Sequence, residues 1–253
     1  MWNPKQYLKF AAPRTRPAVD LLMRVTTEAP ETVYDLGCGT GNVTQMLARR
    51  WPAARIVGVD DSKSMLEKAA SETPNIFWQQ QSIGDWVPDQ PADIIYSNAA
   101  LQWLPDHQTL FPRLMAQLAP GGVLAVQMPR NFDEPSHTLI WETLRAGPWH
   151  AQLEHLIRPS PVAPPDFYYG VLAPLASEID IWETQYLQVL EGKDPVKEWT
   201  KGTWLRQFLE ALNETDRPAF EEDYSMRLHK AYPVRPDGKT LFPFRRLFLV
   251  ARR

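Results

Sequence analysis

Cysteine is almost absent from this chain of 253 residues, in which Cys38 is the only one. No disulfide can form within the chain, and a zinc cluster built from cysteine ligands is excluded. Nothing nearby in the sequence marks Cys38 as a nucleophile. We therefore expect it to pack as a small apolar residue.

Long hydrophobic runs and an excess of basic residues are missing as well. The opening segment, MWNPKQYLKFAAPRTRPAVD, carries charges and prolines where a signal peptide needs an unbroken apolar core, and no later run approaches a membrane span. The net charge is −3, whereas binding along a nucleic-acid backbone requires a basic surplus. We expect a cytoplasmic globular protein with no membrane association, no nucleic-acid partner and no obligate protein partner.

Strand-like and helix-like segments alternate through the first half of the chain. This alternation favours an α/β fold with a parallel sheet and helices on both faces, because right-handed crossovers allow little else. A capping-box pattern from Ser64 to Glu67 marks the second expected helix. The expected strands cover 32–36, 55–59, 76–79, 92–97 and 121–128, and the expected helices cover 42–50, 62–70 and 108–118.

The stretch VYDLGCGTGN, residues 33–42, places three glycines at the end of the first expected strand, where open parallel sheets bind ligands. Gly37, Gly39 and Gly41 let backbone amides approach a ligand closely. Their G-x-G-x-G spacing differs from the dinucleotide pattern G-x-G-x-x-G, and no Lys-Ser/Thr pair follows. Asp35 would repel a pyrophosphate but attract an ammonium group, as on a bound amino acid. The alternative is a tight turn with a strand-end carboxylate.

Further aspartates follow the next expected strands. Asp60 ends RIVGVD, at the distance at which a βαβ unit places an acidic residue against ribose hydroxyls. Asp61 beside it fits the N-terminal cap of the next helix. Asp85, in SIGDW, is placed to accept from the exocyclic amine of adenine, or else is a turn aspartate.

The order and spacing of Asp35, the glycines, Asp60 and Asp85 resemble the class I S-adenosylmethionine (SAM) dependent methyltransferases over about residues 30–130. The resemblance implies a Rossmann-like, seven-stranded sheet flanked by helices, with SAM as cofactor and S-adenosylhomocysteine (SAH) as its product. It implies that the methionine moiety lies near Asp35 and that Asp60 holds the ribose.

The same resemblance implies further contacts with SAM. The adenine is expected beside Met65, Asp85 and Trp86. In related enzymes an arginine ahead of a proline in the N-terminal segment meets the methionine carboxylate, which here implies Arg16. The full set of implied cofactor-binding residues is Arg16, Asp35, Gly37, Cys38, Gly39, Asp60, Asp61, Met65, Asp85, Trp86 and Asn98.

The segment after the fourth expected strand, YSNAALQWLPD, bears on the acceptor of the methyl group. Base-modifying amino-methyltransferases of this superfamily carry an Asn/Asp-Pro-Pro-aromatic run here that holds a planar amine. The residues Ser97 to Ala100 depart from that pattern. A small-molecule acceptor is therefore favoured over a nucleic-acid base.

A closer resemblance spans most of the chain. It is carried by WNPKQYLKF, RTRPAVDLL, WPAARIVGVD, NAALQWLPDH, GGVLAVQMPRNFDEPSH, DIWET and the C-terminal RRLFLVARR, which look like the trans-aconitate methyltransferases. This resemblance implies methyl transfer to one carboxylate of a small unsaturated tricarboxylate, forming a monomethyl ester. A carboxylate with a pKa of about 4 is already ionised at neutral pH, so the transfer needs alignment and no catalytic base.

Two segments lie outside what a core of this type requires. We divide the chain into a SAM-binding core with an N-terminal lid at 1–130, a helical cap at 131–178, and core strands at 179–253 that enclose a second helical insertion at about 193–232. The last expected strands cover 180–190 and 246–252. Trp141, Trp199 and Trp204 could line the acceptor site, although at helical spacing such residues are more often core. His150 and His155 do not share a helical face, so no metal site is expected.

Three carboxylates on the acceptor need cations. Arg158 and Arg206 are the best candidates in the two insertions, because arginine binds a carboxylate through two parallel hydrogen bonds, although either arginine could be a solvated helix residue. Tyr7 and Phe10, in the N-terminal lid, are expected to exclude water. The expected acceptor-binding residues are Tyr7, Trp103, Arg158, Tyr168, Tyr169, Trp199 and Arg206.

Three alternatives remain open at this point. A nicotinamide-dependent oxidoreductase would also use the glycines and Asp60, but it leaves Asp35 and a strand at the C-terminus unexplained. A methyltransferase of another small molecule would keep the same SAM site. A non-catalytic SAM-binding protein of this fold would bind the cofactor tightly without turnover on any acid.

Overall fold

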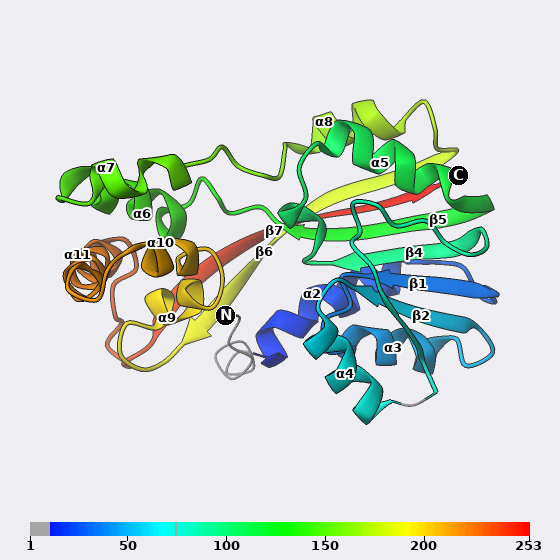
Figure 1. Cartoon of the computed structure of the whole chain (residues 1–253), viewed down its shortest axis with the longest axis horizontal. Coiled ribbons are helices and arrows are strands. Elements are labelled where there is room, and N and C mark those ends of the chain that lie inside the picture. The colour runs from blue at the N-terminus through cyan, green and yellow to red at the C-terminus, as the bar shows by residue number, and fades with distance from the viewer. Residues whose placement is uncertain (1–10, 74) are drawn as a thin grey trace. The chain divides into compact units, whose positions relative to one another are not determined.

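The computed structural model describes residues 11–73 and 75–253 and contains a seven-stranded sheet (Figure 1). The strand order is β3-β2-β1-β4-β5-β7-β6; the first five are parallel, and β7 runs antiparallel to β5. The α/β prediction and the seven strands are confirmed. The strands are β1 (Thr32–Leu36), β2 (Arg55–Asp60), β3 (Phe77–Gln80), β4 (Ala92–Asn98), β5 (Leu118–Pro129), β6 (Glu178–Leu190) and β7 (Thr240–Arg252).

The helices match the sequence pattern in the first half, with one local difference. Helix α4 begins at Lys63, and its N-cap is Ser62, which makes no side-chain capping bond. The capping box at Ser64 is therefore wrong, because Ser64 lies inside the helix, and Asp61 is not the cap. The helices are α2 (Ala11–Arg24), α3 (Asn42–Arg50), α4 (Lys63–Glu72), η1 (Leu101–Trp103), α5 (His107–Ala116), α6 (Pro135–Ala146), α7 (His150–Leu153), η2 (Glu154–Leu156), α8 (Pro165–Leu172), α9 (Pro195–Lys201), α10 (Arg206–Ala211) and α11 (Asp216–Ala231).

The chain divides into two compact units. Among the described residues, the sheet unit comprises 15–73, 75–129, 161–184 and 246–253, and the helical unit comprises 11–14, 130–160 and 185–245. The division differs from the predicted one, because 161–178 belongs with the sheet and not with a cap. Among the described helices, none combines the length and the apolar character that crossing a membrane requires.

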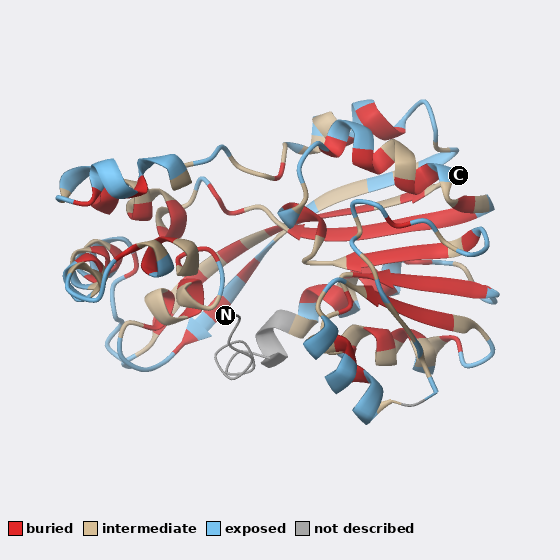
Figure 2. Cartoon of the chain, viewed as in Figure 1, coloured by how far each residue is buried: buried red, intermediate tan, exposed pale blue. Residues whose placement is uncertain are grey.

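Alternate side chains of β1 show how helices cover both faces of the sheet. Tyr34 packs edge-on against Trp86 with ring centroids 5.0 Å apart, and Arg113 of α5 donates to the Trp86 carbonyl at 2.7 Å. Asp35 points to the other face and accepts a hydrogen bond from Thr44 of α3 at 2.6 Å. Because β1 is buried at every position, it forms the centre of a three-layer core (Figure 2).

The segment 161–178 packs on the sheet unit, and a buried tyrosine is one of its contacts. The Tyr168 ring, on α8, lies 5.0 Å from that of Phe111 on α5, and its hydroxyl bonds to His107 Nδ1 at 2.7 Å. A phenol buried with its hydroxyl satisfied holds a helix in place through both its area and its polar end. Tyr168 therefore has a structural role, and its predicted acceptor contact stays a prediction.

Aromatic side chains form the core of the helical unit. The ring centroids of Trp149 and Phe220 lie 5.2 Å apart, and those of Trp199 and Phe242 lie 5.8 Å apart. Trp199 is buried, as the alternative based on helical spacing expects, and its predicted acceptor contact stays a prediction. His137 is buried here too, and burial lowers its pKa to about 3, which keeps the imidazole neutral.

Candidate functional site

The loop between β1 and α3 is the first part of the site. Gly37, Gly39 and Gly41 have φ angles of 77°, 55° and 78°, a region that favours glycine. The backbone N–H groups of Gly37 and Cys38 both donate to the Val59 carbonyl, at 2.8 and 3.0 Å. The loop is thereby tied to the end of β2, on the edge where the sheet order reverses between β1 and β4.

The three glycines face different surroundings. A Cβ atom on Gly37 would lie 2.2 Å from the Ala100 Cβ, and one on Gly41 would lie 2.4 Å from the Trp78 ring. A Cβ on Gly39 would meet nothing within 4 Å. Gly37 and Gly41 therefore serve close packing, whereas Gly39 leaves open space in which a ligand can approach the backbone.

Asp60 joins the glycine loop to the start of α4. One carboxylate oxygen accepts from the Gly39 N–H and the other from the Ser62 N–H, each at 2.9 Å. Burial raises the pKa of Asp60 above its ordinary value, although these two hydrogen bonds oppose the shift. Each oxygen keeps a second acceptor position, so a vicinal diol can still bind to this carboxylate.

Asp35 lies behind the glycine loop and is fully buried. Burial raises the pKa of its carboxyl to about 7; the hydrogen bond from Thr44 opposes this shift, and the nearby charge of Asp60 adds to it. The group therefore titrates near neutral pH, and a cation placed next to it would favour the ionised form. Thr44 was not identified from the sequence; its position two residues into α3, directly after the loop, is the signal that could have revealed it.

Cys38 and the end of β4 complete this edge. The Cys38 thiol is buried, and burial, together with the charges of Asp35 and Asp60, raises its pKa strongly, so it is not a nucleophile. Asn98 is the last residue of β4, and its Oδ1 atom is buried without a hydrogen-bond partner among the described residues. Ala99 follows with φ of 55°, which turns the chain so that Ala100 packs against Gly37.

The residues expected around the adenine differ in how far they are exposed. Met65 is half-buried, and Asp61 and Asp85 are exposed, so these three positions remain predictions. Trp86 has 0% of its side chain exposed, packed against Tyr34. This packing gives Trp86 a structural role, and its predicted contact with adenine stays a prediction.

The remaining expected residues are spread over both units. In the sheet unit, Arg16 lies 3.9 Å from Asp20, and Trp103 and Tyr169 are 58% and 60% exposed. In the helical unit, Arg158 is exposed and Arg206 pairs with Glu210 at 3.0 Å. The roles of these residues stay predictions. Tyr7 and Phe10 lie outside the described residues.

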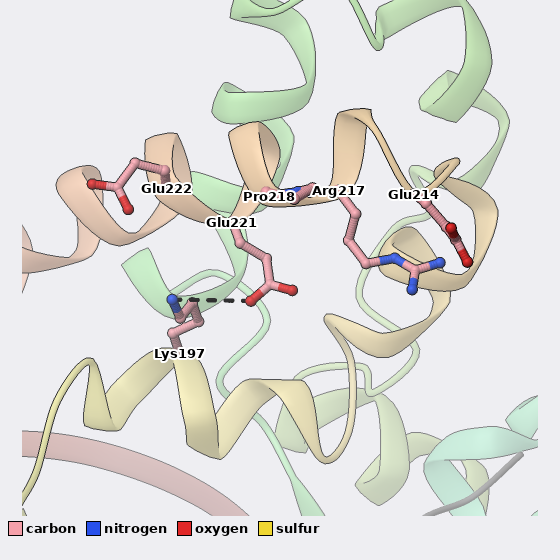
Figure 3. Close-up of a pocket in the computed structure, with 6 residues that line it drawn as sticks. All are labelled: Lys197, Glu214, Arg217, Pro218, Glu221 and Glu222. Carbon is pink, nitrogen blue, oxygen red and sulfur yellow. Dashed lines mark ion pairs between the residues drawn. The ribbon is translucent and has the colours of Figure 1, made fainter.

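A cavity of about 430 Å³ opens on the helical unit between α9 and α11 (Figure 3). Three of its charged side chains are already engaged: Lys197 lies 3.9 Å from Glu221, and Arg217 donates to the carbonyls of Leu209 and Leu212. A lining of mixed charge with most of its cations engaged does not select a ligand. The lining residues are Lys197, Glu214, Arg217, Pro218, Glu221 and Glu222.

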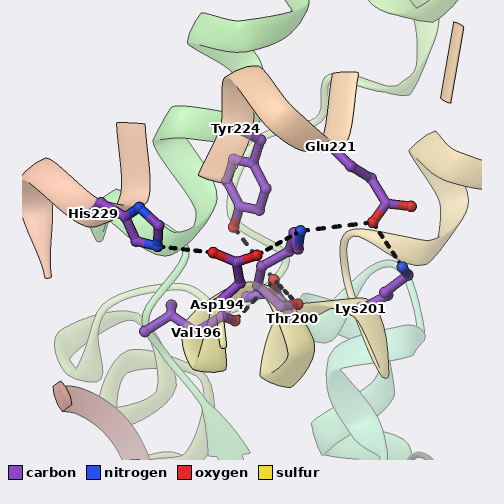
Figure 4. Close-up of polar contacts among 8 residues, drawn as sticks. Asp194, Val196, Thr200, Lys201, Glu221, Tyr224 and His229 are labelled. Carbon is purple, nitrogen blue, oxygen red and sulfur yellow. Dashed lines mark hydrogen bonds and ion pairs between the residues drawn. The ribbon is translucent and has the colours of Figure 1, made fainter. Parts of the chain in front are cut away.

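Polar contacts beside this cavity tie α9 to α11 (Figure 4). Asp194 has a φ of 50°, and its carboxylate oxygens lie 3.2 Å from Lys197 Nζ and 2.8 Å from His229 Nε2. Burial raises the pKa of Asp194, but the hydrogen bonds and charges of Lys197 and His229 outweigh this and lower it below its ordinary value. We assign this network to the structure of the helical unit. Within 11–73 and 75–253, no three His, Cys, Asp or Glu side chains gather as metal ligands do.

Comparisons with known proteins bear on this site directly. A family model described as a methyltransferase domain matches residues 33–122. A trans-aconitate 2-methyltransferase of Azoarcus sp. (strain BH72) is 50% identical over 252 residues, covering 100% of this chain and 99% of the relative. Another, from Yersinia pseudotuberculosis serotype O:1b (strain IP 31758), is 45% identical and covers 99% and 97%. The solved structure of the YcgJ protein from Bacillus subtilis has a TM-score of 0.59 at 17% identity, with 94% and 98% covered, and shares the fold.

Proposed function

Because the chain belongs to the trans-aconitate 2-methyltransferase family of SAM-dependent enzymes, we propose that it methylates one carboxylate of trans-aconitate or a related small polycarboxylate. The observation that carries this conclusion is identity over the full length of enzymes with that activity in their name, not over the glycine loop alone. A nicotinamide-dependent oxidoreductase has no comparable support.

The residues of the sheet unit fit SAM. Gly39 leaves open space beside the loop, and Asp60 keeps an acceptor position on each oxygen for the ribose hydroxyls. Asp35 is a carboxyl that a nearby ammonium group would hold ionised. We infer that the methionine end lies toward Asp35 and Gly37 and that Met65 and Asp85 lie toward the adenine.

The proposed reaction requires the protein to align the two substrates. Bound SAM supplies a sulfonium methyl group. An acceptor carboxylate oxygen forms a bond to the methyl carbon while the carbon–sulfur bond breaks and its electron pair passes to sulfur. No proton moves, because the acceptor is already ionised. The chain therefore has to bind, orient and dry the two substrates, and no side chain is assigned as an acid or base.

Product identification tests the proposal. Purified protein is incubated with methyl-labelled SAM and a panel of di- and tricarboxylates, and the esters are separated and identified. We expect labelled monomethyl ester from trans-aconitate at a higher kcat/KM than from the other acids. Labelling of no acid in the panel, by protein that binds SAM, would contradict the proposal.

The absence of a catalytic base predicts a flat pH profile. With SAM and acid saturating, kcat should be nearly constant from about pH 6 to 9, because the acceptor carboxylates titrate below that window. Initial rates in overlapping buffers measure this. A steep rise between about pH 7 and 8 would indicate a titrating protein group in the chemical step.

Asp35 predicts a pH dependence in SAM affinity instead. Its pKa of about 7 falls when an ammonium group lies beside it, so binding releases a proton at pH values below 7. Affinity should then rise with pH by up to about tenfold per unit below the free pKa, and level off above it. Calorimetry in buffers of different ionisation enthalpy measures the proton release. Asp35→Asn, as the matched control, should bind more weakly and lose this dependence; an unchanged slope would remove Asp35 from the ammonium site.

The acceptor-binding assignments are part of the proposal. We propose that Trp103 and Tyr169 contribute exposed aromatic surface and that Arg158 and Arg206 contribute positive charge, since a polycarboxylate requires both shape and cations. The division into core and insertions is proposed in the same way, with 161–178 moved to the sheet unit.

A further inference from the structure

One face of the sheet carries a row of polar side chains, two of which, Gln127 and Arg246, have no part in the account of SAM binding. In the sheet register Asp35 pairs with Tyr96, Asn98 with Gln127, and Pro129 with Arg246. Side chains alternate along a strand, so residues paired or two apart share a face. Asp35, Asn98, Gln127 and Arg246 therefore point to the same side of the sheet.

This row lies at the edge of the sheet that carries the glycine loop. Asn98 is the last residue of β4, Gln127 is near the end of β5, and β7 enters from the opposite direction beside them (Figure 1). The carboxyl ends of β1 and β4 flank the reversal of strand order, where ligands of such sheets bind. A group held by this row is thus next to the strand end that leads into the glycine loop.

The row is buried, and Asn98 and Gln127 each have a polar atom without a hydrogen-bond partner among the described residues. Arg246 is 6% exposed and Gln127 0%. Arg246 Nη1 donates to Gln127 Oε1 at 3.1 Å, which leaves Gln127 Nε2 buried with no partner in the described part of the chain. The Oδ1 atom of Asn98, which the sheet register pairs with Gln127, is in the same state. A buried polar atom without a partner costs free energy, so two of them at paired positions indicate a ligand.

We propose that Arg246, oriented by Gln127, binds a carboxylate of the acceptor that is not methylated, with Gln127 Nε2 as a second donor. The inference rests on the proposed function and names a binding residue for it. A guanidinium fork beside an amide N–H matches the planar oxygens of a carboxylate. In a buried setting this pairing is strong and directional, because water does not compete with it.

The chemical class of the ligand follows from the charge. A small organic acid with two or more carboxylates places one at the sulfonium methyl group and another on Arg246, whereas a monocarboxylate can do only one of these. Arg246 therefore selects polycarboxylates and sets which carboxylate reacts.

Three variants on β7 test the assignment. Arg246→Met should raise KM for trans-aconitate about tenfold to a hundredfold and leave the SAM dissociation constant unchanged. Arg246→Lys should recover part of the loss, because it restores charge without the fork. Arg252→Met is the matched control. Arg252 is on the same strand and face but pairs with Val123 at the other end of β5. The KM of this variant for trans-aconitate should equal that of wild type.

A selectivity measurement separates direct contact from a general defect. Loss of Arg246 should reduce kcat/KM for trans-aconitate more than that for a monocarboxylate such as crotonate, which has no second carboxylate for Arg246 to bind. Equal losses on both acids, or an equal rise of KM in Arg252→Met, would overturn the assignment.

Binding and folding are measured independently of turnover. Trans-aconitate is titrated calorimetrically into SAH-loaded wild type and Arg246→Met, which reports on the subsite even if wild type has no activity. If Arg246→Met does not fold, Gln127→Leu takes its place and should weaken acid binding in the same assay. Unchanged acid affinity in a folded variant overturns the inference, whereas wild type that binds the acid through Arg246 without methylating it contradicts only the proposed function.

Discussion

Replacing Gly37 by alanine is expected to destabilise the protein by about 2 to 5 kcal/mol and to abolish detectable SAM binding. The added Cβ would lie 2.2 Å from the Ala100 Cβ, and the φ of 77° disfavours any side chain. Relief of the overlap must move the end of β4 away from the glycine loop, which separates two parts of the site. Denaturant unfolding and calorimetric titration with SAM measure the two effects.

Gly39→Ala provides the matched control in the same loop. Its φ of 55° also disfavours a side chain, but the added Cβ would meet nothing within 4 Å. We expect a stability loss of only about 1 to 2 kcal/mol, with weaker SAM binding because the methyl group occupies the ligand's space. Equal stability losses in the two variants would show that close packing against Ala100 is not the reason for a glycine at position 37.

Asp60→Ala is expected to weaken SAM binding by about 1 to 3 kcal/mol, the scale of hydrogen bonds to a charged acceptor. The structure adds a second consequence, because the carboxylate also accepts from the N–H groups of Gly39 and Ser62. The variant should therefore lose some stability as well as affinity. Titration calorimetry gives the affinity, and thermal unfolding without SAM gives the stability.

A second carboxylate, on α4, separates these effects from a loss of charge. Glu72 is exposed at the C-terminal end of this helix, so Glu72→Ala removes one negative charge but no bond in the glycine loop. We expect this variant to bind SAM within about threefold of wild type. A folded Asp60→Ala variant with wild-type affinity would exclude Asp60 from the ribose site.

The strands and helices of the first half could be predicted because their signals are local. Hydrophobic runs bounded by turn residues place β1, β2 and β4 within a residue of their observed ends, and the glycines mark the loop without reference to the rest of the chain. Trp86 could not be predicted in this way. Its sequence neighbourhood matched an adenine contact, but packing against Tyr34, 52 positions earlier, buries it.

The sequence was therefore sufficient to identify the sheet type, the glycine loop and its carboxylates, since each depends on residues a short distance apart. Long-range pairing placed Arg246 beside Gln127, 119 positions away, and moved 161–178 from the predicted cap onto the sheet unit. Register between distant strands decides which side chains share a face, and no local pattern encodes it. Cofactor residues could thus be predicted from the chain, whereas the acceptor subsite proposed here emerges only when β4, β5 and β7 are paired.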